Sequence, residues 1–377
     1  MNAVFKRTLR PVVQMGNELQ IGMNENHTTL DDPDGLVFQL TELLDGTHSN
    51  EEVAVKLGIS MEEVEGAIAA LDGLGFIESS EVPGTFKDSE LERYEANLNY
   101  YSSYSNLETS KYSFQEKLKG AKVAVIGLGG GCLTTAYLAG LGVGEIRGLD
   151  FDTVGRSNLN RQFIFNENDI GRLKSEVAQE KVEAINPDIS VTMYNREITS
   201  HHDLLDIIDG CDIVLSMIDS PTIVCSRWVN AACYIKGIPY IQGGFMNKIV
   251  VWERFDPAHG SCYDCRLIDS IVKDPSEEYR LRTVYNLIFS RRNTGFAPHV
   301  SMLTGFFASE VVKYITDYAN VSKAYSQLNT ETMELVQQDH QFERVPTCPT
   351  CGEKAFEEIS SLDELIESAK EMRVPHG

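Results

Sequence analysis

A glycine-rich turn is the part of this sequence best suited to chemistry. The apolar segment VAVIG, residues 123–127, runs directly into GLGGGC. In this turn Gly127, Gly129 and Gly130 allow backbone N–H groups to approach a phosphate at a helix N-terminus. Glycine turns between a strand and a helix are common, so this turn alone indicates a phosphate site only weakly.

Charged residues after the turn sharpen that interpretation. Asp150 and Asp152 end the next apolar segment, at the distance expected for a ribose-binding acid. Arg161 and Lys174 then supply two cations that a hydride-transfer enzyme does not need. Cations beside a phosphate-binding turn suit a triphosphate whose own phosphates react, so a dinucleotide oxidoreductase is the weaker interpretation.

Two C-x-x-C pairs form the clearest metal signal. Cys262 and Cys265 make the first pair, and Cys348 and Cys351 make the second. Together they predict a tetrahedral thiolate site for Zn²⁺, structural because four protein ligands leave no open position. A redox-active pair is the alternative. The other cysteines lie in apolar or helical settings and are expected to pack as small hydrophobic residues: Cys132, Cys211, Cys225 and Cys233.

Strand and helix patterns alternate through residues 120–355, which predicts one α/β domain with a doubly wound, mostly parallel, Rossmann-like sheet. Ligands of such sheets bind outside the carboxyl ends of the strands. The glycine turn, Asp150 and Asp219 all fall at strand ends of this kind. The sequence therefore places them in one site.

Composition restricts the partners. The chain has 377 residues and a formal net charge of −23, which argues against nucleic acid and anionic membranes as partners. No apolar run approaches the roughly 20 residues of a membrane span, and the N-terminus has no apolar signal region. We expect a cytoplasmic protein, in which reduced cysteines favour metal over disulfides.

The motifs together resemble those of the ThiF/MoeB family, bacterial relatives of the ubiquitin-activating enzymes. Its members carry a G-x-G-G-x-G turn, D-x-D-x-V, S-N-L-x-R-Q and a downstream lysine; this chain has GLGGGC, DFDTV, SNLNRQ and Lys174 in that order. The resemblance covers roughly residues 90–352. It implies ATP-dependent activation of a carboxylate as an acyl-adenylate, by a homodimer.

The resemblance also implies roles for single residues. Asp150 matches the acid that binds the ribose hydroxyls. Asn158, Arg161 and Lys174 match residues that contact the phosphates, where fixed cations stabilise charge as pyrophosphate leaves. Asp219 matches a residue that holds Mg²⁺ between the phosphates.

Departures from the family pattern are informative. Cys132 replaces the last glycine of the turn. Relatives often carry an arginine, which reaches the neighbouring subunit's nucleotide, at the position of Ala96. Either another cation replaces it, with Arg291 and Arg292 as candidates, or the nucleotide step differs. Residues 266–295, where thioester-forming or sulfur-transferring relatives place a reactive cysteine, contain no cysteine.

Residues 1–84 predict a separate winged-helix-like module. The pattern indicates a hairpin around Gly16–Asn17, three helices and a short strand, with capping boxes at Ser49 and Ser60. Apolar residues at helical spacing, among them Val55, are expected to face its core. The third helix is acidic, which disfavours DNA binding.

The same segment resembles the PqqD-like recognition domain of peptide-modifying enzymes. There a leader peptide pairs as an extra strand with the hairpin and lies beside the third helix. Residues 85–119 are expected to form a partly helical connector, and residues 356–377 a charged helical tail.

Three functions remain open. The first is adenylation of a C-terminal or Asp/Glu side-chain carboxylate on a ribosomally made precursor peptide, as in family members that make microcin C- or pantocin-type antibiotics. The second is a non-catalytic protein that delivers a leader peptide to another enzyme. The third is activation of a sulfur-carrier protein, which leaves residues 1–84 without a role.

Overall fold

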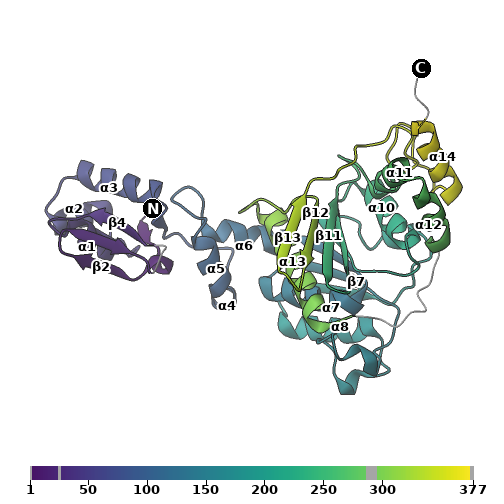
Figure 1. Cartoon of the computed structure of the whole chain (residues 1–377). Coiled ribbons are helices and arrows are strands. Elements are labelled where there is room, and N and C mark those ends of the chain that lie inside the picture. The colour runs from purple at the N-terminus through teal and green to yellow at the C-terminus, as the bar shows by residue number, and fades with distance from the viewer. Residues whose placement is uncertain (1, 24–26, 286–294, 374–377) are drawn as a thin grey trace. The chain divides into compact units, whose positions relative to one another are not determined.

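The computed structural model describes residues 2–23, 27–285 and 295–373. It separates into two compact units, Met1–Lys117 and Leu118–Gly377, which Figure 1 colours from purple to blue and from blue to yellow. Each unit has its own hydrophobic core.

Short strands form two small sheets in the N-terminal unit. β2 (Val12–Met15), β3 (Glu18–Ile21) and β4 (Thr28–Asp31) make an antiparallel sheet in that order. β1 (Ala3–Phe5) pairs with β5 (Ile77–Ser79). The predicted hairpin around Gly16–Asn17 is confirmed, with Gly16 at φ 64°. β1 and β4 were not predicted from the sequence.

Three helices pack on these strands: α1 (Leu36–Leu43), α2 (Asn50–Leu57) and α3 (Met61–Gly73). Both predicted capping boxes are present, because Ser49 and Ser60 each accept a hydrogen bond from the backbone three residues on. Val53 is fully buried. The expectation for Val55 is wrong: its side chain is 82% exposed, because at two residues from Val53 it lies on the other side of α2.

The segment after β5 is helical, as expected of a connector. It contains α4 (Asp88–Arg93), α5 (Glu95–Ser102) and α6 (Lys111–Gly120). Ala96 lies near the start of α5.

The C-terminal unit is built on an eight-stranded sheet in the order β13-β12-β11-β10-β9-β6-β7-β8. Its neighbours from β10 to β8 pair in parallel, and those from β10 to β13 pair antiparallel. The strands are β6 (Lys122–Ile126), β7 (Glu145–Leu149), β8 (Ser190–Tyr194), β9 (Ile213–Ser216), β10 (Tyr240–Met246), β11 (Ile249–Phe255), β12 (Tyr325–Asn329) and β13 (Glu334–Gln338).

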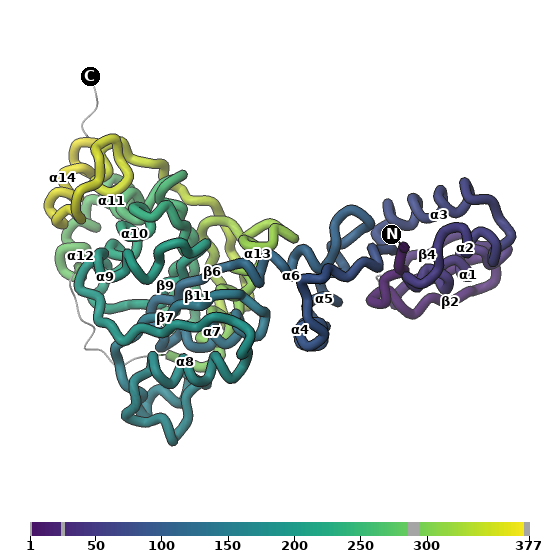
Figure 2. Tube along the Cα trace, turned by 180° about the vertical axis from the view of Figure 1, so that it is seen from behind, coloured from purple at the N-terminus to yellow at the C-terminus, as the bar shows by residue number. Residues whose placement is uncertain are grey.

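Helices cover both faces of this sheet (Figures 1 and 2). α7, α8 and α13 pack on one face, and α9, α10, α11, α12 and α14 gather on the other. They span α7 (Leu128–Leu141), α8 (Lys174–Ile185), α9 (His202–Leu205), α10 (Val224–Lys236), α11 (Tyr263–Lys273), α12 (Ser276–Val284), α13 (Ala297–Thr316) and α14 (Leu362–Arg373).

The α/β sheet expected over residues 120–355 is confirmed as mostly parallel. The antiparallel edge formed by β12 and β13 was not anticipated. The tail is helical as expected, and it belongs to the core of this unit, because Leu365, Ile366 and Ala369 are fully buried there. Among the described helices, none has the length and apolar character needed to cross a membrane.

Candidate functional site

The glycine turn lies at the point where the order of the parallel strands reverses. β6 pairs in parallel with β7 on one side and β9 on the other, and the chain passes from β6 into α7 through Gly127. Ligands of open α/β sheets bind at such a switch point. The glycine turn therefore lies at the strand end where the sequence places it.

The three glycines of the turn face different neighbours. Gly127 has φ 94°, and a Cβ there would meet the Met217 backbone carbonyl at 3.1 Å. A Cβ on Gly130 would meet only the flexible end of Met217, at 2.9 Å. A Cβ on Gly129 would point toward Gln162 and lie 4.0 Å from Lys174 Nζ. Gly129 thus keeps open the space beside the lysine.

Lys174 is held at that space by an acid. Its side chain is 6% exposed, and its Nζ donates to Asp152 Oδ2 at 2.7 Å. The Lys174 backbone N–H also donates to the Asp152 carbonyl, at 2.9 Å. Gln162 is buried beside Gly129, and its Oε1 has no hydrogen-bond partner among the described residues. Gln162 follows Arg161 in the SNLNRQ motif, but no role was predicted for it from the sequence.

Asp150 caps the glycine turn from the end of β7. Its Oδ2 accepts from the Leu128 N–H at 2.9 Å, and its Oδ1 accepts from the Asp152 N–H at 2.9 Å. Burial raises the pKa of Asp150, while the charge of Lys174 opposes that rise. The carboxylate thus lies between the first turn of α7 and the lysine.

Asn158 and Arg161 lie on the neighbouring turn. Asn158 Oδ1 accepts from the Gly155 N–H at 2.9 Å. The Arg161 guanidinium donates to the Ser157 carbonyl at 2.7 Å and to Asn160 Oδ1 at 2.9 Å. Both side chains therefore hold the turn together in this structure.

Asp219 follows β9 in an exposed loop. The preceding residues, Met217 and Ile218, border Gly127 and Gly130, so the loop that carries Asp219 adjoins the glycine turn. Arg291 and Arg292, the proposed replacements for the arginine missing at Ala96, lie outside the described residues.

These features fit a bound nucleoside triphosphate. The start of α7 offers backbone N–H groups, Gly129 leaves room beside a buried ammonium, and Gln162 supplies an unused polar atom. Cys132 at the position of the last family glycine is fully buried, and its Sγ donates to the Gly129 carbonyl at 3.2 Å. Close contact between α7 and β6 is provided instead by Gly131, where a Cβ would meet Val125 at 2.6 Å.

The two C-x-x-C pairs converge on one buried cluster. Cys262 Sγ lies 3.9 Å from Cys265 Sγ and 3.6 Å from Cys348 Sγ, and Cys265 Sγ lies 3.3 Å from Cys351 Sγ. Tetrahedral zinc with bonds of about 2.3 Å separates its sulfurs by about 3.8 Å. The Val345 N–H donates to Cys265 Sγ at 3.3 Å, as backbone groups around structural zinc do. The residues therefore fit Zn²⁺.

A buried ion pair anchors this cluster. Asp264, between the first two cysteines, accepts from Arg227 on α10 at 2.7 and 2.8 Å, and Thr350 donates to it at 2.7 Å. Arg227 also donates to the Ser360 carbonyl at 2.8 Å. The cluster, α10 and the C-terminal segment are thereby joined. The Arg227–Asp264 pair was not predicted from the sequence. The only sequence signal for it was the position of Asp264 inside the first C-x-x-C pair.

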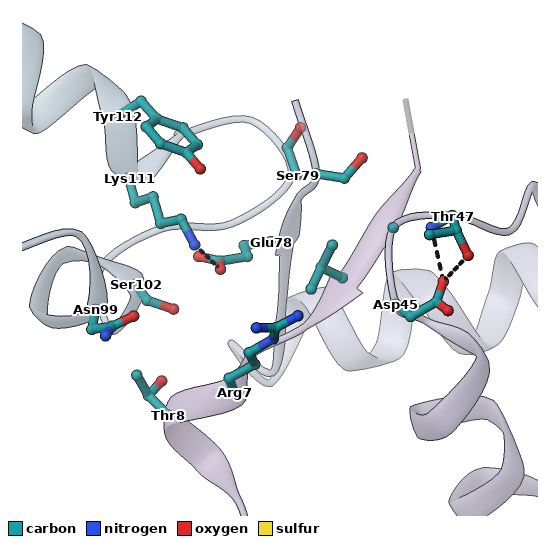
Figure 3. A pocket seen from close by; sticks show the side chains of 13 residues that line it. Arg7, Thr8, Asp45, Thr47, Glu78, Ser79, Asn99, Ser102, Lys111 and Tyr112 are labelled. Atoms are coloured by element: carbon teal, nitrogen blue, oxygen red, sulfur yellow. Dashed lines mark hydrogen bonds and ion pairs between the residues drawn. The ribbon is translucent and has the colours of Figure 1, made fainter. Parts of the chain in front are cut away.

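The N-terminal unit contains a polar pocket of about 380 Å³, shown in Figure 3. It is lined by β1, β5, the turn after α1, and parts of α5 and α6. An ion pair of 2.6 Å joins Lys111 to Glu78 on one side of it. Ser102, also in the lining, is buried, and its Oγ has no hydrogen-bond partner among the described residues. Side chains of both charges therefore line the pocket.

Comparison with known proteins places the chain in a family. The ThiF family model matches residues 101–350. The molybdopterin-synthase adenylyltransferase of Salmonella typhimurium is 30% identical over 63% of this chain and 90% of its own. The ThiS sulfur-carrier adenylyltransferase of Escherichia coli is 30% identical over 67% of this chain and 94% of its own.

One solved structure is similar over almost the whole chain. The crystal structure of E. coli MccB has a TM-score of 0.73 at 24% identity and covers 96% of this chain and 99% of its own. MccB, a microcin C7 biosynthetic enzyme, has also been solved with ATP and with N-formylated MccA. At this identity the likeness establishes a shared fold. The family match over residues 101–350, with the glycine turn, Asp150 and Lys174 assembled at the strand switch point, shows that this chain belongs to the ThiF family of ATP-dependent adenylating enzymes.

Proposed function

We propose that this protein adenylates a carboxylate of a ribosomally made precursor peptide, in the biosynthesis of a peptide antibiotic. The observation that carries the proposal is the share of this chain that each similar protein covers. The sulfur-carrier adenylyltransferases match 63% and 67% of this chain, whereas the MccB structure covers 96% of it. The family model begins at residue 101, so residues 1–100, most of the N-terminal unit, lie outside the family match, and activation of a sulfur carrier gives them no role.

In this proposal ATP is a substrate at the glycine turn. A carboxylate oxygen of the peptide attacks the α-phosphorus, the bond to the bridging oxygen breaks, and pyrophosphate leaves with its electron pair. Lys174 and Arg161 stabilise the charge on the phosphates. Asp150 would accept hydrogen bonds from the ribose, and Asn158 orders the turn beside the phosphates. Asp219 would hold a Mg²⁺ that neutralises negative charge on the phosphates.

The cysteines favour this chemistry over thioester formation. All eight are buried, and residues 266–295 contain none. Four form the proposed zinc site. Burial raises the pKa of the other four thiols, among them Cys225 to about 12 and Cys211 to about 11. A buried, protonated thiol is a poor nucleophile, so none of these four is suited to accept the acyl group.

The leader would bind to the N-terminal unit, in the manner of a PqqD-like domain. β2 and β4 each pair with β3 alone among the described strands, so each has an edge on which an extended peptide could add a strand. Exposed apolar side chains, Val13 and Met15, lie on β2. We include a homodimer in the proposal because the resemblance to the ThiF/MoeB family implies one, although Ala96 stands where relatives carry the arginine that reaches the neighbouring subunit.

The test is the nucleotide product. The purified protein, with Mg²⁺ and the peptide encoded beside its gene, should convert ATP into AMP and pyrophosphate, and omission of the peptide should stop release of pyrophosphate. Asp219→Ala should reduce turnover by about a hundredfold or more, which is the scale of losing transition-state electrostatics. Asp209→Ala, which removes a surface acid paired with Lys236, is the matched control.

Two results would overturn the assignment. Formation of ADP and phosphate would mean that the carboxylate is phosphorylated. Pyrophosphate release with a sulfur-carrier protein, and none with the peptide, would establish the alternative that the sulfur-carrier relatives favour. If neither substrate supports turnover while the peptide binds, the protein delivers leader peptides to another enzyme.

A further inference from the structure

A second group of metal-ligating side chains lies apart from the cysteines, in the C-terminal unit. His201 and His202 stand at the start of α9, and Glu358 comes from the segment that precedes α14. The three ligand atoms lie within 4.8 Å of one another. His202 Nε2 is 2.8 Å from one oxygen of Glu358, and His201 Nε2 is 3.8 Å from the other.

His201 is the unusual member. Its side chain is 2% exposed, and its Nε2 has no hydrogen-bond partner among the described residues. Leaving a buried polar atom unpaired costs about 1–3 kcal/mol. The ring is held in place by edge-on packing against Phe356, at 5.7 Å between centroids. The buried Nε2 of His201 lies near the Glu358 carboxylate but has no hydrogen-bond partner among the described residues. A cation bound between the two side chains would provide that partner.

The distances fit such a cation. Bonds of about 2.0–2.1 Å in tetrahedral geometry place neighbouring ligand atoms about 3.3 Å apart. The separations of 2.8 and 3.8 Å run from the two histidine nitrogens to different oxygens of Glu358 and lie on either side of that value, and the three ligand atoms all lie within 4.8 Å of one another. Two imidazoles and one carboxylate suit zinc and other late transition metals, and Mg²⁺ and Ca²⁺ prefer sites made of oxygen alone.

We propose that His201, His202 and Glu358 form a second, exchangeable binding site for a divalent transition metal such as Zn²⁺, which fastens the C-terminal segment to α9. The remaining position is open to water, since Glu358 and His202 are exposed. Arg227 already holds the same segment two residues later, at Ser360. The metal would therefore fix the short path that leads into α14. This site is independent of the proposed adenylation.

The test is a titration of the full chain that already carries its cysteine-bound zinc. Calorimetry with Zn²⁺ should show one further saturable equivalent. Glu358→Gln and His202→Asn should each weaken it at least about tenfold, since even loss of a ligand's supporting contacts has that effect. Both replaced side chains are exposed, so folding should survive. Glu357→Gln, which changes the adjacent exposed acid, should bind as the unaltered protein does.

Two further measurements complete the test. Zn²⁺ should raise the melting temperature of the unaltered protein and of the Glu357 variant, but not of the Glu358 variant. Co²⁺ in the second site should show weak d–d absorption without the strong thiolate charge-transfer bands of a cysteine site. No saturable equivalent, equal affinity in the Glu358 and Glu357 variants, or thiolate bands from the added Co²⁺ would each overturn the proposal.

Discussion

The ammonium group of Lys174 lies 2.7 Å from the carboxylate of Asp152, and the two side chains differ sharply in exposure, at 6% and 55%. The acid at the rim therefore orients a cation that is otherwise buried beside Gly129. Lys174 is buried, is paired with one exposed carboxylate and lies beside the space that Gly129 leaves open. This arrangement suits the binding of a second anion in that space. Asp152 is thus a positioning residue for Lys174.

Lys174→Met should lower adenylation by about a hundredfold, because it removes charge from the phosphate site. Asp152→Asn leaves the ammonium in place but loosens it, so we expect a loss of about tenfold, mainly in kcat and less in KM for ATP. Lys236→Met, which removes a surface lysine paired with Asp209 at 2.6 Å, is the control. Steady-state kinetics would contradict the positioning role if Asp152→Asn retained full kcat.

The three glycines of the turn should respond differently to alanine. Gly127→Ala should destabilise the fold by about 1–3 kcal/mol or more, because φ 94° is unfavourable for alanine and the new Cβ would meet a backbone carbonyl. Gly130→Ala meets only the end of Met217 and gains helix propensity, so its stability should stay within about 1 kcal/mol of the parent.

Gly129→Ala separates folding from binding. Its Cβ would displace the flexible end of Gln162 and narrow the space beside Lys174, so the protein should fold normally while KM for ATP rises about tenfold, or about 1.4 kcal/mol. Urea denaturation and kinetics on the three variants check this order. If all three variants changed the stability equally, the atoms that surround each glycine in this structure would not determine the effect of the substitution.

Much of the C-terminal unit could be predicted because its local signals agree with its fold. Apolar strands and helices follow one another along this unit, as the alternating patterns over residues 120–355 predict. β12 and β13 could not be found in this way, since β13 is exposed along its length and has no apolar alternation. The partner of Lys174 and the orphaned Gln162 depend on packing between distant segments, which periodicity does not report.

Loss of the zinc site should lower the stability of the fold more than it affects the adenylation reaction directly. We expect one tightly held zinc per chain, retained through dialysis against a weak chelator, since the four buried thiols match a tetrahedral site. Cys348→Ser and Cys265→Ser should lose the metal and unfold at lower denaturant concentration. Cys211→Ser changes a buried cysteine outside the cluster and should retain the zinc. A metal-free protein with unchanged stability would contradict the structural role.

Leader binding should reside in the N-terminal unit and depend on salt. The third helix carries Glu62, Glu63 and Glu65, so a leader with basic character should bind less tightly as ionic strength rises, because exposed charges are screened beyond about 10 Å at 0.1 M salt. Calorimetry of the full chain with a leader-only peptide measures this directly. Met15→Glu, on the exposed face of β2, should weaken binding, whereas Val55→Glu, on the solvent side of α2, should not.

Deletion of residues 1–84 gives the complementary result. Modification of the full-length peptide should stop at low peptide concentration and recover weakly at high concentration, because the nucleotide site lies in the other unit and only effective concentration is lost. The comparison requires that the truncated protein retain its zinc and bind ATP as the full chain does. If such a protein modifies the peptide as well as the intact enzyme does, and the leader alone shows no heat of binding, the recognition role fails and activation of a sulfur carrier becomes the better explanation.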